Sequence, residues 1–151
     1  GEVALDAFLS AEFNAEMLDV AQLERAGVDR VCTTPAGRHL LIEYKTDTRA
    51  VATGNAFIEL VSVDGIHGKK GWAHTCKSDA LIYFCPTADG SGKAYWLSPA
   101  NIRAALGGWL IRYPKREVAN KGYKTTGIIV PLAEIERIAQ SVYQVGGLAL
   151  T

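Results

Sequence analysis

The chain has 151 residues, of which 48% are hydrophobic, and this is enough for a single domain over residues 1–151 with a core of its own. Its 16 basic and 16 acidic residues cancel, and no apolar run reaches the roughly 18 residues of a membrane span, so composition alone indicates neither a nucleic-acid nor a membrane partner. Three irregularly spaced cysteines and the lack of a signal-peptide pattern lead us to expect a cytoplasmic protein without a membrane partner.

The N-terminal part of the chain has the apolar spacing of a helix over residues 5–25. Apolar side chains that recur every three to four positions predict a helix with one buried face, and Gly27 is a typical residue for its end. Beside the apolar stripe runs an acidic one, formed by Glu12, Glu16 and Asp19.

A β-hairpin is predicted next, over residues 27–47. Two short apolar runs, 28–32 and 40–44, flank the turn signal Thr34-Pro35-Ala36-Gly37. Because side chains alternate along a strand, Glu43 and Lys45 share one face. A hairpin that is symmetric about Ala36 places Asp29 opposite Glu43, whereas a slip of one residue would move Asp29 to the other face.

The remainder of the chain predicts further helices and strands around one sheet. A continuous apolar run over 80–85 indicates a central strand that is covered on both faces. Ser98-Pro99 is a typical helix start, and Gly107-Gly108 is expected to end that helix. The other expected elements are a helix over 51–62, a basic loop over 63–77, strands over 94–97 and 126–130, and a helix over 132–143. This order, αββαββαβα, predicts a mixed sheet with helices on both sides.

Two carboxylates on one sheet face are costly unless a positive charge lies between them. Mg²⁺ prefers carboxylate oxygens and water, and leaves coordination positions open for a phosphate. A lysine one step along the strand is suited to position an attacking water or to neutralise charge on phosphate oxygens. Asp29, Glu43 and Lys45 therefore point to metal-assisted hydrolysis of phosphodiester bonds.

The pattern Val28-Asp29, turn, Glu43-Tyr44-Lys45 resembles the signature of the PD-(D/E)xK nuclease superfamily, with Val28 in place of the proline. The resemblance covers roughly the first 85 residues. It implies an α/β, restriction-endonuclease-like fold, in which a mixed β-sheet flanked by helices has an αβββαβ-type core. It also implies a metal-dependent endonuclease acting on DNA. Two of the three leading strands of that core can be identified from the sequence.

The same resemblance assigns roles to individual residues. Asp29 and Glu43 correspond to the ligands of Mg²⁺ or Mn²⁺, and Lys45 to the catalytic lysine. Many members add an acid from the first helix, here Glu12, Glu16 or Asp19, with Glu16 as the expected residue. A polar residue on the following helix often assists, and Glu59 or Asn55 corresponds to it.

Basic residues interleaved with aromatic ones form two stretches beyond the motif. Lysines and arginines suit phosphate contacts, and Trp72, Tyr113 and Tyr123 lie among them. Solvated loops with aromatic side chains packed in the core are the alternative. The expected DNA-binding residues are Lys69, Lys70, Arg112, Lys115, Arg116, Lys121 and Lys124.

Other interpretations of the motif remain open at this point. Asp29, Glu43 and Lys45 can be a salt-bridge ladder on a solvated sheet face, worth at most about 1 kcal/mol. The chain can also be a nucleic-acid-binding module without catalysis, or a structural or regulatory protein. As an endonuclease with one site it would need a homodimer or two visits to cut both strands, and the apolar run 145–150 is a candidate contact between subunits.

Overall fold

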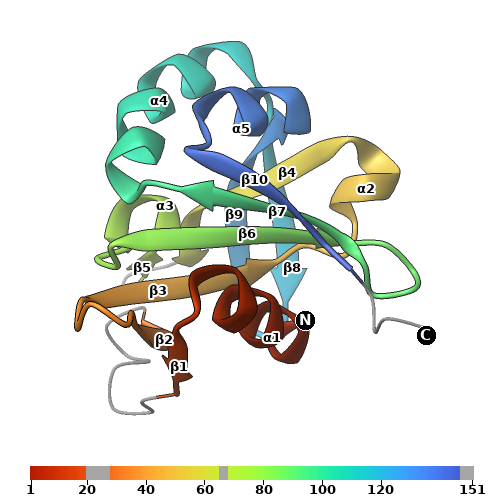
Figure 1. Cartoon of the computed structure of the whole chain (residues 1–151). Helices are drawn as coiled ribbons and strands as arrows, with labels where there is room; N and C mark the ends of the chain where they lie inside the picture. Colours follow the sequence, from red (N-terminus) through yellow and green to blue (C-terminus); the bar gives the residue numbers. More distant parts are fainter. Residues whose placement is uncertain (20–27, 65–67, 147–151) are drawn as a thin grey trace.

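The computed structural model describes residues 1–19, 28–64 and 68–146, which form two β-sheets and five helices (Figure 1). The six-stranded mixed sheet has the order β1 (Glu16–Leu18), β2 (Arg30–Thr33), β3 (His39–Thr46), β6 (Ala80–Pro86), β7 (Gly92–Leu97) and β10 (Ser141–Val145). The four-stranded sheet has the order β5 (Lys69–Lys70), β4 (Asn55–Val63), β9 (Tyr123–Pro131) and β8 (Lys115–Asn120). The helices are α1 (Glu2–Phe13), α2 (Ala50–Thr53), α3 (Trp72–Thr75), α4 (Pro99–Arg112) and α5 (Leu132–Ile138).

The predicted hairpin is present as β2 and β3, and its register is the expected one. Arg30 pairs with Ile42 and Thr33 with His39, so the two strands are symmetric about Ala36. Strand β3 also pairs with β6, and this pair is parallel, whereas the other pairs of the six-stranded sheet are antiparallel. The hairpin therefore lies inside a mixed sheet rather than on its own.

The first helix is shorter than predicted. Helix α1 ends at Phe13, and Asn14 follows in the left-handed conformation with φ of 45°. The chain then forms β1, in which Met17 pairs with Cys32 of β2. Packing on β2 thus overrides the helical spacing, because Met17 finds its apolar contacts in a sheet. Residues 20–25 of the predicted helix and Gly27 lie outside the described residues.

The predicted helix over 51–62 is wrong. Helix α2 covers only Ala50–Thr53, Gly54 ends it with φ of 73°, and the nine-residue strand β4 follows. In β4 the side chains alternate, with Ala56, Ile58 and Leu60 buried in the core. This period of two is the strand signal that competes with the helical one.

Several boundaries beyond the hairpin also differ from the prediction. The described part of the predicted loop over 63–77 contains β5 and α3, and β8 occupies much of the basic stretch 112–124. Helix α4 continues past Gly107-Gly108 to Arg112, because Trp109 is buried in the core and holds the last turn. The predicted helix over 132–143 ends at Ile138, and β10 then pairs with β7. Val145 belongs to β10, and the rest of the apolar run from 147 onward lies outside the described residues.

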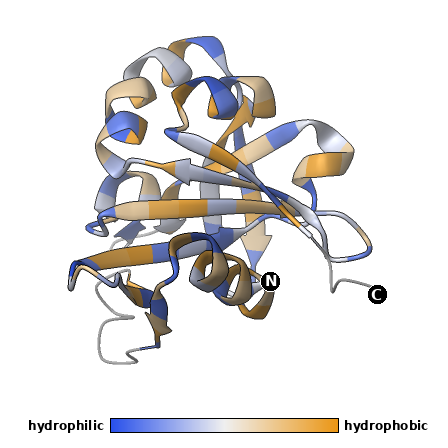
Figure 2. Cartoon of the chain, in the orientation of Figure 1, coloured by the Kyte–Doolittle hydropathy of each residue, from blue (hydrophilic) through white to orange (hydrophobic). Residues whose placement is uncertain are grey.

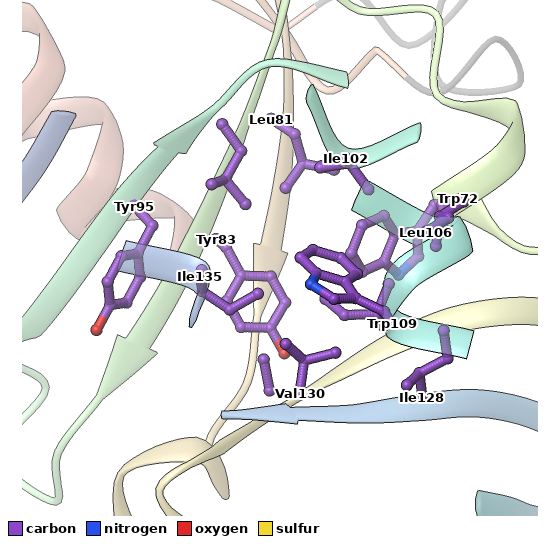
Figure 3. Packing of buried hydrophobic residues seen from close by; sticks show 14 of the residues in the cluster. Trp72, Leu81, Tyr83, Tyr95, Ile102, Leu106, Trp109, Ile128, Val130 and Ile135 are labelled. Carbon is purple, nitrogen blue, oxygen red and sulfur yellow. The ribbon is translucent and has the colours of Figure 1, made fainter. Parts of the chain in front are cut away.

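The central strand β6 divides the core, as its apolar run predicts. Its side chains alternate: Ile82 and Phe84 pack with α1, while Leu81 and Tyr83 pack with α4, α5 and the four-stranded sheet. Figure 1 accordingly has α1 on one side of the six-stranded sheet and β9 on the other, and most of β6 is coloured hydrophobic in Figure 2. In Figure 3 the rings of Tyr83 and Trp109 reach between the sheets toward Val130.

The fold class is mixed α/β, with helices on both sides of the larger sheet. Within the described part of the chain, none of the helices has the combined length and hydrophobicity that crossing a membrane would require.

Candidate active site

Glu43 and Lys45 lie together on the face of β3 that is turned away from α1. The Glu43 side chain is only 6% exposed, and the Nζ of Lys45 lies 2.8 Å from its Oε1. The second oxygen, Oε2, is buried and has no hydrogen-bond partner. An ionised carboxylate in such surroundings is expected to be fully paired, so an oxygen without a partner marks a position where a ligand is expected.

The thiol of Cys76 also lies beside Glu43. Burial, and next a hydrogen bond to Glu43, raise the pKa of the Cys76 thiol to about 12, so the thiol stays protonated at neutral pH. Because Glu43 is buried, it does not belong to a salt-bridge ladder on a solvated face. Two carboxylates without a cation were the reason to predict a metal ion. Lys45 supplies such a cation to Glu43.

Asp29 is held next to the backbone of β3, just before β2 begins. Its backbone N–H donates to the carbonyl of Ile42, and its Oδ2 accepts a 2.7 Å hydrogen bond from the backbone N–H of Tyr44. Tyr44 is the residue between Glu43 and Lys45. The Asp29 carboxylate is therefore fixed beside the Glu43-Tyr44-Lys45 segment, as the hairpin register predicts.

A pocket of about 590 Å³ opens between the end of β3 and the four-stranded sheet. Lys45 and Glu59 both line it, although Glu59 lies on a strand and not on the predicted helix. Gly71 packs against Glu59 so closely that a Cβ there would lie 2.4 Å from the carbonyl oxygen of Glu59 and 2.7 Å from its Cγ. Glu59 therefore lines the pocket from strand β4, and its predicted place on a helix is wrong.

Asp47 and Tyr83 are pocket residues that the sequence reasoning missed. The hydroxyl of Tyr83 donates to Oδ2 of Asp47, which also lies 3.4 Å from the backbone N of Phe57. Burial, and next the charge of Asp47, raise the pKa of Tyr83 well above its ordinary value. Strand alternation could have predicted Asp47, because it follows Glu43 and Lys45 at the same spacing of two residues. These bonds tie the end of β3 to β4 and to β6.

The acids that were expected from the first helix lie elsewhere. Glu16 is on β1 opposite Thr33, at the far end of β2 from Asp29. Glu12 is exposed near the end of α1. Asp19 lies 3.8 Å from Arg30, which is adjacent to Asp29 in the chain. The structure therefore gives Glu16 no place beside the hairpin carboxylates.

The expected DNA-binding residues belong mainly to the four-stranded sheet. Lys69 and Lys70 form β5 at one edge, and Lys115 and Arg116 lie in β8 at the other. Arg116 lines the pocket. Arg112 lies 3.5 Å from Glu134 and over the ring of Tyr113, Lys124 lies 3.7 Å from Glu117, and Lys121 is exposed in the turn between β8 and β9.

The hairpin site fits a hard divalent ion better than a soft one. Within the described residues, no three His, Cys, Asp or Glu side chains come together as a metal-binding group. Mg²⁺ does not need such a cage, because it commonly uses one or two carboxylates together with water and substrate phosphate. The unpaired Oε2 of Glu43 is a free ligand atom for it.

No protein-family model, curated protein or solved structure matches this chain.

Proposed function

We propose that this chain is a metal-dependent endonuclease that hydrolyses phosphodiester bonds in DNA. The observation that carries the proposal is the buried Glu43, with one oxygen paired to Lys45 and the other without a partner, beside a pocket that Lys45 lines. Buried polar atoms in folded proteins usually have a hydrogen-bond partner, so the unpaired Oε2 supports a role in binding a ligand.

Asp29 and Glu43 are the residues that would hold Mg²⁺ or Mn²⁺ in this proposal, and Glu59 is an additional acid in the adjoining pocket. A bound divalent ion would lower the pKa of a water molecule bound to it and would stabilise charge on phosphate oxygens. Asp29 is already positioned by its bond to Tyr44, so little side-chain freedom remains to be lost when a ligand binds.

Lys45 acts on the phosphate in this proposal. Its side chain is 33% exposed, which allows it to contact both Glu43 and a molecule in the pocket. Its ammonium group can orient an attacking water and can neutralise charge that develops on the phosphorus oxygens. The ion pair with Glu43 keeps the ammonium group at the pocket edge before substrate binds.

The order of elements around the site supports the proposal, because a helix and three strands come first, as in the expected core. Helix α1 is followed by β1, β2 and β3, and β6 then lies parallel to β3. The segment between β3 and β6 departs from the expected single helix, because it contains α2, β4, β5 and α3. Two of these elements, β4 and α3, contribute Glu59 and Trp72 to the pocket.

The experiment is an incubation of the protein with supercoiled, linear and branched DNA in Mg²⁺, Mn²⁺ or EDTA. We expect nicking that requires the metal and that falls about 100-fold or more in Lys45→Met. Lys93→Met is the matched control, because Lys93 is an exposed strand lysine outside the pocket. Cleavage that persists in EDTA, or that Lys45→Met leaves unchanged, would contradict the proposal.

A nucleic-acid-binding module without catalysis is the second candidate. The observation in its favour is the 2.8 Å ion pair, which neutralises Glu43 without a metal. This candidate predicts DNA binding that survives Glu43→Ala and no cleavage at any metal concentration. A structural or regulatory protein would bind no DNA even at low salt, where phosphate contacts are strongest.

A further inference from the structure

One wall of the pocket is formed by the four-stranded sheet, and its side chains follow from the strand register. Glu59 of β4 and Arg116 of β8 both pair with Gly127 of β9, so the three residues form one row across the sheet. Strands lie about 4.8 Å apart, which places the Cα atoms of Glu59 and Arg116 about 10 Å from each other. The side chains of Glu59 and Arg116 thus flank Gly127, which has no side chain.

The ring of Phe57 fills the space above that position. A Cβ on Gly127 would lie only 2.5 Å from Cζ of Phe57, so the ring extends across β9 because residue 127 is a glycine. Phe57 is half-buried and lines the pocket, as does Val118 of β8. An aromatic surface therefore lies between Glu59 and Arg116.

Charged side chains of both signs line the pocket. Lys45, Arg49 and Arg116 are the cations that line it, and Asp47 and Glu59 are the acids. The carboxylate of Asp47 is occupied by Tyr83 and by backbone N–H groups, so its charge is stabilised inside the protein. Arg49, Arg116 and the Glu43-paired Lys45 therefore face the pocket together with one open acid, Glu59. Phe57 lines it together with two other aromatic residues, Trp72 and Tyr83.

We infer that the pocket binds a single unpaired nucleic-acid strand, with a base on Phe57 and the adjoining phosphates between Arg116 and Lys45. Aromatic stacking and cations along a groove are the means by which proteins hold unpaired strands. A volume of about 590 Å³ lies in the range of small-ligand pockets, so it admits a base that is out of its helix and not a stacked base pair. The inference gives the proposed nuclease its substrate class, and it rests on the proposed function for the cleavage step alone.

The test is a binding measurement by fluorescence anisotropy in EDTA, where no cleavage occurs. The probes are a labelled single-stranded DNA oligonucleotide, the same sequence as duplex DNA, and its single-stranded RNA counterpart. We expect the unpaired strand to bind about tenfold or more tightly than the duplex. Preference for the DNA or the RNA strand would assign the sugar, and both results support the inference.

Two variants and one control locate the binding in the pocket. Phe57→Leu and Arg116→Ala are each expected to weaken strand binding about fivefold or more. Lys115→Ala is the control for charge, because Lys115 neighbours Arg116 in β8 but does not line the pocket. Circular dichroism and thermal melting check that each variant folds, and Arg116→Lys provides a second variant that keeps the charge on the exposed strand β8.

The outcomes separate this inference from the proposed function. Equal affinity for duplex and strand, or equal losses in Arg116→Ala and Lys115→Ala, would overturn the inference even if the protein cleaves DNA. Tight strand binding that depends on Phe57 and Arg116, without metal-dependent cleavage, would support the inference and contradict the nuclease proposal.

Discussion

The two faces of the β2–β3 hairpin carry ionic groups in contrasting states. On the α1 face, the guanidinium of Arg30 is buried and each of its nitrogens has a partner: Nε lies 3.0 and 3.1 Å from the two oxygens of Asp6, Nη2 lies 2.9 Å from Glu2, and Nη1 donates to the carbonyl of Asp29. The Tyr44 hydroxyl donates to the same Asp6 at 2.7 Å. On the opposite face, Oε1 of Glu43 is paired with Lys45, and Oε2 has no hydrogen-bond partner.

The contrast separates a structural cluster from a candidate site on one hairpin. Hydrogen bonds to Asp6 and Glu2 outweigh burial and raise the pKa of Arg30, so its charge is permanent. The bonded cluster joins α1 to the hairpin, and Arg30 also donates to the carbonyl of Asp29. Removing one partner from a bonded buried charge destabilises the fold, whereas an unpaired buried oxygen leaves a position that a ligand can occupy.

Glu43→Gln is the substitution with the largest expected effect on this comparison. We expect the proposed metal-dependent cleavage to fall about 1,000-fold, because the proposed metal ligand and the partner of Lys45 are lost together. If the native chain binds Mg²⁺ as proposed, the ion is expected to raise its melting temperature, and this increase should be absent in Glu43→Gln. Glu117→Gln, at an exposed carboxylate outside the pocket, is the control. A Mg²⁺-dependent shift that persists in Glu43→Gln would remove Glu43 from the site.

Arg30→Met should act on stability and not on metal binding. It leaves Asp6 and Glu2 without their cation at the α1 face, and because these side chains are 31% and 56% exposed, water solvates them in part and the expected cost is about 2 kcal/mol. Urea denaturation measures the loss, and Arg38→Met in the exposed hairpin turn is the control. Equal stability of the two variants would mean that the bonded cluster contributes little to the fold.

Tyr44→Phe is a milder change on the same face. It removes the hydroxyl that donates to Asp6 but keeps the ring, so we expect a loss of about 1–2 kcal/mol in the free energy of unfolding. Burial, followed by the bond to Asp6, raises the pKa of Tyr44 far above its ordinary value, so the loss should be independent of pH near neutrality. A loss in the free energy of unfolding that varies between about pH 6 and about pH 9 would contradict this assignment.

Glu134 is another carboxylate in which both oxygens accept hydrogen bonds, and its substitution should have the smallest effect. Hydrogen bonds from Arg137, and next from Trp109, lower its pKa to about 2 from an ordinary value of 4.5. A lowered pKa in the folded state contributes stability above about pH 4.5, and this contribution is lost as pH falls toward 2. Glu134→Gln should therefore flatten the acid limb of a stability curve in that interval, and an unchanged limb would contradict the assignment.

The candidate site could be predicted in part because its geometry is local. Strand alternation and a turn signal fix the register of Asp29 and Glu43, since both lie within 15 residues of each other on one hairpin. The helix over 51–62 could not be decided in this way, because helical and strand periods both fit its apolar residues. Pairing of β4 with β9, from about 70 residues downstream, decided in favour of a strand.

The sequence by itself determined the hairpin, the central strand β6, the start of α4 at Ser98 and the residues Glu43 and Lys45 as neighbours on one face. Only the tertiary structure decided that Glu43 is buried with an unpaired oxygen and that Glu59 and Arg116 share a row across Gly127. The physical reason is distance along the chain. Alternation and turn chemistry act between near neighbours, whereas burial and the pocket depend on strands that meet only after the second sheet has packed on the first.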